Sequence, residues 1–109
     1  MKIKIIKKIK WNNKGLIPVI TQDIFTKKIL MLAWMNKKSL EKTIKNKEAF
    51  YWSRKRKEIW YKGKNSGCIQ KVYNIYLDCD KDCLLLIVKQ ILNYSCHTGK
   101  KTCFYNKIL

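Results

Sequence analysis

Several residue types are scarce in this 109-residue sequence, and their scarcity excludes whole classes of protein. No apolar run reaches the roughly 18–20 residues of a membrane-spanning helix, so we expect no membrane partner. The basic segment 1–10 lacks a continuous apolar stretch and a small-residue cleavage site, so we expect no signal peptide. One proline and four glycines leave no linker-like segment, and no part of the chain repeats. The length therefore predicts a single domain over residues 1–109.

Acidic residues are also scarce, since seven Asp and Glu stand against 25 Lys and Arg, for a net charge of +18 at pH 7. Such a charge is typical of proteins that bind nucleic acid. However, 23 of the basic residues are lysine, and the chain also has 15 isoleucines and 8 asparagines but two alanines. Lys, Ile and Asn are encoded by A- and T-rich codons. We therefore interpret the charge as codon bias on a solvated surface, and we expect no nucleic-acid partner.

Arginine occurs only twice, and both copies lie in the segment 53–56. A planar guanidinium binds phosphate through two parallel hydrogen bonds that an ammonium cannot reproduce. Because lysine fills the other basic positions, the pattern favours Arg54 and Arg56 as phosphate ligands. The alternative is that both arginines lie on a solvated hairpin turn.

Five cysteines without an export signal indicate a reducing, cytoplasmic location, where cysteines bind metal or pack in a core more often than they form disulfides. Cys79, Cys96 and Cys103 lie in polar or turn-like surroundings. Six residues around Gly99 separate Cys96 from Cys103, so a loop can bring both thiolates onto one ion. Three protein ligands and an open position are typical of a catalytic zinc site, whereas four ligands form a closed structural site.

The other two cysteines and the single histidine give weaker signals. Cys83 begins an apolar strand and is interpreted as a core residue, whereas Cys68 is either loop filler or part of a pocket wall. His97 directly follows a candidate zinc ligand. Because imidazole titrates near neutral pH, His97 is a candidate for proton transfer.

Three of the seven acids lie within five residues, at Asp78, Asp80 and Asp82. Carboxylates this close repel one another unless they are solvated or neutralised, and oxygen ligands suit a hard cation such as Mg²⁺. In an extended chain alternate residues share a face, which would direct the aspartates to one side and Cys79 to the other. The alternative is a solvated turn between two strands.

Hydrophobic periodicity predicts one main helix among about six strands. We expect a helix over 37–46 that is capped by Asn36, and an edge strand or a frayed arm within 2–11. Residues 69–77 alternate without interruption, which places Val72 and Ile75 on opposite faces. The expected strands cover 16–23, 29–35, 49–53, 58–62, 69–79 and 83–90. This order favours an α+β fold with a mostly antiparallel β-sheet.

Taken together, these motifs resemble the phosphoribosyl-AMP cyclohydrolase family, which catalyses the third step of histidine biosynthesis. The resemblance covers residues 15–105 in the family's order, whereas residues 1–14 are a weakly assigned N-terminal arm. The family usually has Asn or His where this chain has Cys68. The matching segments are Gly15-Leu-Ile-Pro-Val-Ile20, Leu30-Met-Leu-Ala-Trp-Met-Asn36, Tyr51-Trp-Ser-Arg-Lys-Arg56, Ile59-Trp-Tyr-Lys-Gly63, Ser66-Gly67, Asp78-Cys-Asp-Lys-Asp82, Cys96-His-Thr-Gly99 and Cys103-Phe104.

The resemblance implies two metal sites in an intertwined homodimer. The three aspartates of segment 78–82 match the family's magnesium ligands. Its zinc site takes one cysteine from the neighbouring subunit, which matches Cys79, and its other two ligands match Cys96 and Cys103. Some relatives carry a pyrophosphohydrolase domain fused downstream, and we expect none here because the chain ends soon after Cys103.

The implied reaction is the hydrolytic opening of the adenine ring of 1-(5-phosphoribosyl)-AMP between N1 and C6. Water activated by zinc would attack C6, and His97 would transfer a proton. The competing hypothesis is a small basic module with a closed four-cysteine zinc site, which binds nucleic acid without catalysis through its lysines, Trp52 and Trp60. The substrate contacts expected in the matching segments are Trp52, Ser53, Arg54, Arg56, Lys62, Gly63, Ser66 and Gly67.

Overall fold

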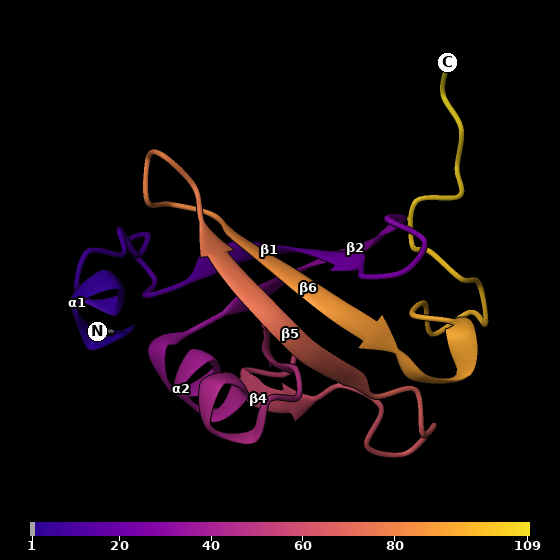
Figure 1. Ribbon diagram of the computed structural model, residues 1–109, viewed down its shortest axis with the longest axis horizontal. Coiled ribbons are helices and arrows are strands. Elements are labelled where there is room, and N and C mark those ends of the chain that lie inside the picture. Colours follow the sequence, from indigo (N-terminus) through magenta and orange to yellow (C-terminus); the bar gives the residue numbers. More distant parts are fainter. Residues whose placement is uncertain (1) are drawn as a thin grey trace.

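The computed structural model describes residues 2–109, which form one layer of sheet with a helix and a hairpin on one side (Figure 1). None of the helices in this part of the chain is long and apolar enough to cross a membrane. The strands and the main helix agree with the predicted ranges to within two residues, and the α+β class is confirmed. In chain order the elements are α1 (Lys2–Ile6), β1 (Ile17–Asp23), β2 (Ile29–Met35), α2 (Lys37–Asn46), β3 (Phe50–Ser53), β4 (Glu58–Tyr61), β5 (Gln70–Leu77), β6 (Leu84–Gln90) and the 3-10 turn η1 (Ile91–Asn93).

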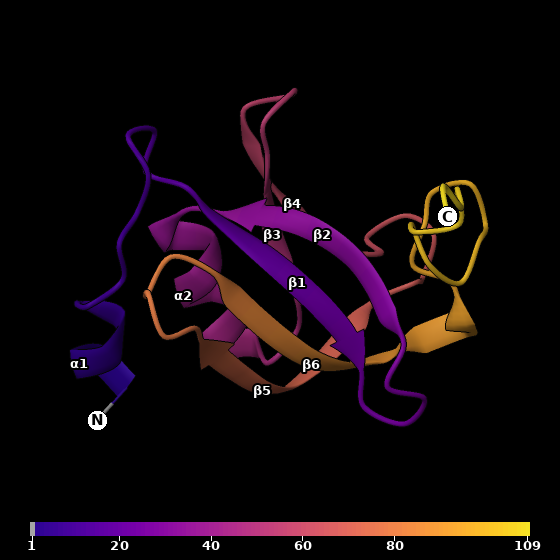
Figure 2. The ribbon, with the colours of Figure 1, turned by 90° about the horizontal axis from the view of Figure 1, so that it is seen from above.

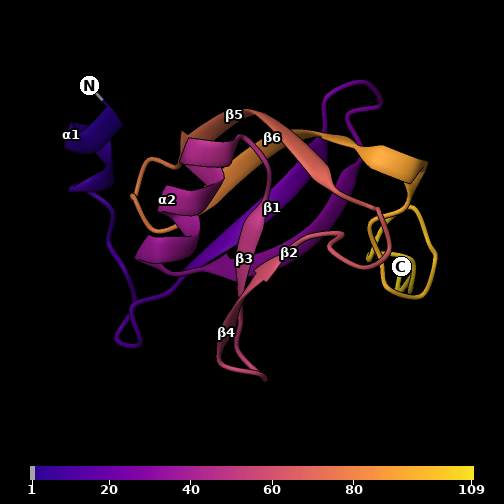
Figure 3. The same ribbon diagram turned by 90° about the horizontal axis from the view of Figure 1, so that it is seen from below.

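Four strands form one sheet in the order β2-β1-β6-β5. The pairs β1–β2 and β5–β6 are antiparallel, whereas β1 and β6 are parallel. A separate antiparallel hairpin consists of β3 and β4. This hairpin and α2 lie over one face of the sheet (Figure 3), and no helix of residues 2–109 covers the opposite face (Figure 2). The pairing is therefore mostly antiparallel, as predicted.

The main helix begins at its predicted cap. Asn36 Oδ1 accepts a hydrogen bond from the N–H of Ser39 (2.8 Å), and Ser39 Oγ accepts one from the N–H of Asn36 (2.9 Å). This reciprocal pair satisfies two donors that a helix start leaves without partners. The helix ends where Lys47 adopts a left-handed conformation with φ of 54°. Leu40 and Thr43 are buried, so the inner side of α2 packs onto the layer below it.

The covered face of the sheet forms the hydrophobic core, which includes the buried side chains of Ile17, Val19 and Leu86. Strand β5 differs from the predicted uninterrupted alternation. Its pairing with β6 shifts between Val72 and Asn74, so a bulge lies at this point. Because a bulge adds one residue, Val72 and Ile75 both pack against the core, and the predicted opposite placement is wrong.

The N-terminal segment also differs from the prediction, because Lys2–Ile6 is the helix α1 rather than an edge strand. The edges of the sheet are β2 and β5. Ile6 and Ile9 pack against the core, and the N–H of Ile9 donates to the carbonyl of Ile6 (3.2 Å). This spacing of three residues is helical, and the partial alternation of Lys and Ile concealed it.

A chain of buried hydrogen bonds crosses the core and ends at the start of β5. Tyr51 Oη donates to Gln70 Oε1 (2.5 Å), and the hydroxyl of Thr21 lies 2.8 Å from the same Oη. Gln70 Nε2 donates to Gln90 Oε1 (2.8 Å), and Gln90 Nε2 donates to the carbonyl of Cys68 (3.0 Å). A fully satisfied network of this kind favours one arrangement of the core. It therefore holds the chain at Cys68, next to the site described below.

Candidate functional site

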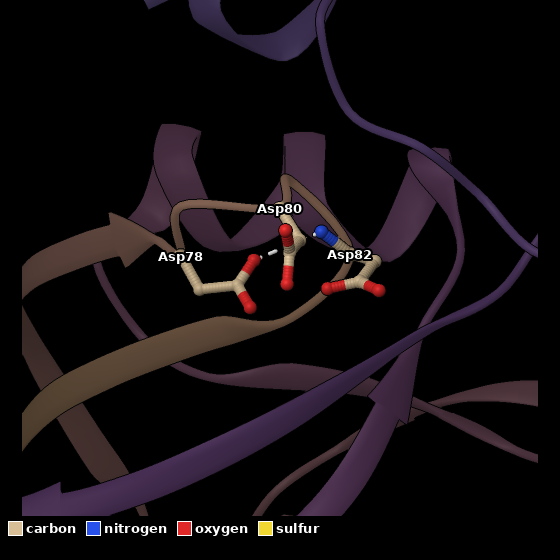
Figure 4. A group of neighbouring side chains, drawn as sticks. All are labelled: Asp78, Asp80 and Asp82. Carbon is tan, nitrogen blue, oxygen red and sulfur yellow. Dashed lines mark hydrogen bonds between the residues drawn. The ribbon is translucent and has the colours of Figure 1, made fainter.

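The turn between β5 and β6 brings three carboxylates together (Figure 4). One oxygen from each of Asp78, Asp80 and Asp82 lies within 4.8 Å of the others, and all three residues are exposed. Desolvation raises the pKa of Asp82, and the neighbouring carboxylates of Asp78 and Asp80 raise it further. The turn therefore gathers oxygen ligands against their mutual repulsion, and this donor set fits a hard divalent cation.

The aspartates converge for a reason other than the predicted one. Residues 78–83 form a tight turn rather than an extended strand, in which Lys81 has φ of 64°. Asp78 Oδ1 accepts hydrogen bonds from the N–H groups of Asp82 (2.9 Å) and Cys83 (3.2 Å), which close the turn. The argument from alternation is therefore wrong, although the three carboxylates do lie together. Cys79 is exposed in the same turn.

A second cluster lies in the loop after β6. The N–H of Cys96 donates to the carbonyl of Lys100 (3.1 Å), and the N–H of Gly99 donates to the carbonyl of Cys96 (2.9 Å). Gly99 has φ of 86°, which a glycine adopts without strain. Thr98 Oγ1 donates to Cys96 Sγ (3.0 Å). This hydrogen bond, together with the N–H of Thr98, lowers the pKa of the buried Cys96 thiol and favours its thiolate.

Cys103 returns to the same place from further along the chain. Its N–H donates to the carbonyl of Leu30 in β2 (2.7 Å), which anchors the segment to the sheet. Its thiol lies next to that of Cys96, so that each thiol changes the pKa of the other. Burial raises the pKa of Cys103 to about 11, and Cys96 contributes to this shift. The loop thus unites two of the three cysteines that the sequence assigns to one ion.

The third cysteine lies at the other end of the molecule. Cys79 follows β5 and Cys96 lies beyond the end of β6, and these two strands are antiparallel. A seven-residue strand such as β6 spans roughly 20 Å, so the two cysteines lie beyond opposite ends of the hairpin (Figure 1). Among the described residues, no cluster of three metal-ligating side chains contains a cysteine. One chain alone therefore completes neither the predicted three-cysteine site nor the competing closed site.

A cavity of about 460 Å³ lies beside Cys96, between the β4–β5 loop and the loop after β6. A Cβ atom at Gly63 would collide with the backbone of Cys68 and Ile69, so only glycine allows the two segments to approach this closely. His97 is exposed on the cavity wall. The predicted residues that line the cavity are Arg56, Lys62, Gly63, Ser66, Cys96 and His97.

Arg54 and Arg56 occupy different surroundings, although they are two residues apart. Arg56 lines the cavity, where its Nε lies 3.6 Å from Glu58 Oε1. Both of these side chains are 58% exposed, so the ion pair is weak and leaves Arg56 available to an anion. The Arg54 guanidinium instead stacks on the ring of Trp34, 4.6 Å from its centroid. The Arg54 side chain therefore packs against Trp34, whereas the Arg56 side chain lines the cavity.

Three other predicted contacts, Trp52, Ser53 and Gly67, are not part of the cavity wall within residues 2–109. Conversely, the wall contains residues that sequence reasoning missed. Glu58 and Tyr94 line the cavity, yet no local pattern singles them out. Glu58 directly precedes one matching segment, and Tyr94 lies two residues before another. Cys68 also lines the cavity and is 3% exposed, which resolves its two readings in favour of a pocket wall.

The sequence of this chain is similar to those of one family of known proteins. A sequence model of the family described as phosphoribosyl-AMP cyclohydrolase matches residues 31–105. The phosphoribosyl-AMP cyclohydrolase of Janthinobacterium sp. (strain Marseille) is 51% identical over 104 residues, covering 95% of this chain and 78% of its own length. The protein of the same name from Nitrosospira multiformis is 52% identical over 101 residues, covering 93% of this chain and 78% of its own length.

We expect Asp80→Asn to weaken the binding of Mn²⁺, used as a spectroscopic substitute for Mg²⁺, by about tenfold or more. The substitution removes one of three carboxylate charges but leaves the hydrogen bonds that Asp78 accepts. Titration followed by electron paramagnetic resonance would measure the affinity. Glu41→Gln, which removes an exposed carboxylate from α2, serves as the control. Equal affinities of Asp80→Asn and the native chain would show that the aspartates form only a solvated turn.

Proposed function

The chain belongs to the phosphoribosyl-AMP cyclohydrolase family and is an enzyme of that class, and we propose that it hydrolyses the N1–C6 bond of 1-(5-phosphoribosyl)-AMP with the help of zinc. In this reaction the oxygen of water bonds to C6, the C6–N1 bond breaks, and a proton is supplied on the N1 side. The product is the phosphoribosylformimino-aminoimidazole carboxamide ribotide of histidine biosynthesis. The observation that carries the proposal is the pair of adjacent thiols, Cys96 and Cys103, beside a cavity with cationic walls.

The proposed zinc ligands are Cys79, Cys96 and Cys103. Sulfur donors suit zinc, and the lowered pKa of Cys96 favours the thiolate that binds metal. All five cysteines are free thiols, which suits the reducing cytoplasm that we propose as the location. When it is bound, a zinc ion with three protein ligands and an open position activates a water molecule near neutral pH.

Completing this ligand set requires a second copy of the chain, because Cys79 lies beyond the opposite end of the β5–β6 hairpin from Cys96. We propose a homodimer in which Cys79 of one subunit joins Cys96 and Cys103 of the other. Cys79 lies between Asp78 and Asp80, so the same contact would carry the partner's carboxylates to the cavity. The proposed magnesium site of one subunit and the proposed zinc site of the other would then be neighbours.

The uncovered face of the sheet offers an interface for this dimer. Ile20 is in register with Leu32 on one side and with Leu85 on the other, and Tyr76 continues the row beside Leu85. Leu32 is 48% exposed and Tyr76 is 55% exposed. A contiguous apolar row on the surface is typical of an interaction site. A second copy that covered it would also enlarge the small buried core of a chain of this length.

The remaining roles are assigned to residues of the cavity wall. His97 is exposed beside Cys96, and its imidazole is assigned the transfer of a proton to N1 as the C6–N1 bond breaks. The phosphates of the substrate are assigned to Arg56 and to the loop segment 63–66 in the cavity wall. Asp78, Asp80 and Asp82 would hold Mg²⁺, which would supply positive charge for a phosphate or order the turn.

The proposed function can be tested by incubating the purified protein with Zn²⁺, Mg²⁺ and phosphoribosyl-AMP. Ultraviolet absorbance then measures the loss of the purine. We expect Cys96→Ser and Cys103→Ser each to abolish turnover and to lower bound zinc, because each removes one of three ligands. Cys83→Ala should keep zinc and most of the activity, since this half-buried thiol contacts the carbonyl of Leu84 (3.7 Å). If Cys83→Ala loses zinc as the other variants do, the site is closed and the catalytic proposal fails.

Shared ligands make a second prediction possible. Cys79→Ser and Cys96→Ser subunits should both be inactive alone, yet a mixture of the two should regain activity. In a mixed dimer, one of the two sites receives all three native cysteines. Subunits would be exchanged under mild denaturation, and zinc content and activity measured. Absence of recovery in a mixture that mass spectrometry shows to contain mixed dimers would contradict a shared site.

The different surroundings of the two arginines lead to a third prediction. Charge-assisted hydrogen bonds contribute roughly 1.5–3 kcal/mol each, so Arg56→Ala should lower kcat/KM by about 10- to 150-fold, mainly through KM. Arg56→Lys should lose much of this despite keeping the charge. Arg54→Ala should leave KM nearly unchanged and lower the free energy of unfolding by about 0.5–1 kcal/mol, because it removes the contact with Trp34.

Steady-state kinetics and denaturant unfolding of the same variants distinguish these roles. Lys7→Ala and Lys8→Ala, at exposed positions away from the cavity, serve as controls for the overall positive field. An Arg54→Ala variant that loses as much kcat/KM as Arg56→Ala, with unchanged stability, would show that both arginines bind phosphate.

A further inference from the structure

One buried cation in the cavity wall forms no ion pair with a carboxylate of the described residues. Lys62 directly follows β4, is 6% exposed, and donates from Nζ to the carbonyl of Ser95 (2.6 Å). Its ammonium also lies 5.8 Å from the centroid of the Trp60 ring. The one ion pair within residues 2–109 joins Arg56 and Glu58 instead. A buried ammonium loses much of its hydration, so it requires hydrogen bonds and a nearby negative charge in return.

The groups near this ammonium that can carry a negative charge include three thiols. Lys62 lines the same cavity as Cys68 and Cys96, and the loop that it contacts at Ser95 carries both Cys96 and Cys103. Two of these three residues are the proposed zinc ligands of this subunit. Three thiolates carry one negative charge more than a zinc ion neutralises, and a lysine in the same cavity wall opposes that excess.

The hydrogen bond from Lys62 also fixes the backbone of the cysteine loop. Ser95 directly precedes Cys96, and its Oγ lies within hydrogen-bond distance of the carbonyls of Leu30 (3.1 Å) and Lys101 (3.0 Å). Lys62 therefore connects the end of the β3–β4 hairpin to Ser95, the residue whose side chain also bonds the loop to β2. This connection bridges 33 positions of the sequence.

We propose that Lys62 is the positioning residue and counter-charge of the cysteine site, where it holds the Ser95–Cys96 backbone and stabilises the thiolates that bind zinc. The inference rests on the proposed function, because it assumes a zinc ion at these cysteines. It replaces the role that the sequence suggested for Lys62, namely a phosphate contact. A phosphate ligand is expected to extend into the cavity, whereas this Nζ is buried and bonded to a main-chain carbonyl.

Three substitutions in the full-length protein separate the charge from the hydrogen bond. Lys62→Met removes both, Lys62→Gln keeps a donor without the charge, and Lys62→Arg keeps the charge. Zinc affinity would be measured by competition with a chelator, and the thiolate environment by the sulfur-to-metal charge-transfer band of the Co²⁺-substituted protein. Lys45→Met, which removes an exposed lysine of α2, controls for the change in net charge.

We expect Lys62→Met and Lys62→Gln to weaken zinc binding by about 10- to 100-fold, and Lys62→Arg to weaken it less. Loss of the positive charge beside sulfur should also move the Co²⁺ band to longer wavelength in Lys62→Gln, while Lys45→Met leaves it unchanged. If Lys62→Met does not fold, the comparison of Lys62→Gln with Lys62→Arg carries the test, because these two side chains keep a donor.

The outcomes separate this inference from the proposed function. If the native protein holds no zinc at its cysteines, the proposed function itself fails. If the native protein binds zinc, and Lys62→Gln and Lys62→Arg bind it equally tightly with an unshifted Co²⁺ band, the inference is overturned. If Lys62→Gln raises KM without changing zinc affinity, Lys62 is a phosphate ligand and the inference is also overturned.

Discussion

The buried side-chain amide of Gln70 interacts with three other strands at once. Its Oε1 accepts a hydrogen bond from Tyr51 of β3, and its Nε2 donates to Gln90 of β6 and lies 3.3 Å from the Met31 sulfur of β2. A buried amide left without partners costs about 1–3 kcal/mol, so any displacement of the β3–β4 hairpin from the sheet is unfavourable. This constraint matters for function because Lys62 and Gly63, at the end of the hairpin, form one wall of the cavity.

The opposite wall has little regular secondary structure and is held by a few hydrogen bonds to main-chain carbonyls. Three of them meet at Leu30, whose carbonyl accepts hydrogen bonds from Ser95, Thr102 and Cys103. Lys62 adds the one connection from the hairpin side. Irregular backbone can be ordered in this way when its polar groups find partners in neighbouring elements. The spacing of Cys96 and Cys103 therefore depends on the sheet edge and on the hairpin together.

The antiparallel geometry of β5 and β6 separates the two clusters of metal-ligating residues. The carboxylates lie in the turn between these strands, and the paired thiols lie beyond the far end of β6. Cys79 lies in the same turn as the carboxylates, but its thiol is the same kind of ligand as the thiols of the second cluster. Under the proposed dimer, this single cysteine couples the carboxylate turn of one subunit to the thiols of the other. The function of each site would then depend on the contact between subunits rather than on the fold of one chain.

Local features of the protein followed from the sequence because neighbouring residues specify them. The cap of α2 requires only Asn36 and Ser39, and hydrophobic periodicity predicted the ranges of the strands to within two residues. The carboxylates of segment 78–82 meet in a tight turn, so their proximity in sequence was enough to predict their proximity in space. The ordered motifs likewise identified the family over most of the chain.

Other features depend on contacts between distant segments, which local patterns do not encode. Only the tertiary structure decided the parallel pairing of β1 with β6, the stacking of Arg54 on Trp34, and the bulge that turns Val72 inward. The sequence by itself determined which side chains are available for chemistry: the cysteines, the aspartates and the two arginines. The tertiary structure decided which of these side chains lie together. A buried group such as the Lys62 ammonium needs a hydrogen-bond partner, and packing of the hairpin against the sheet supplies one from a distant segment, the carbonyl of Ser95.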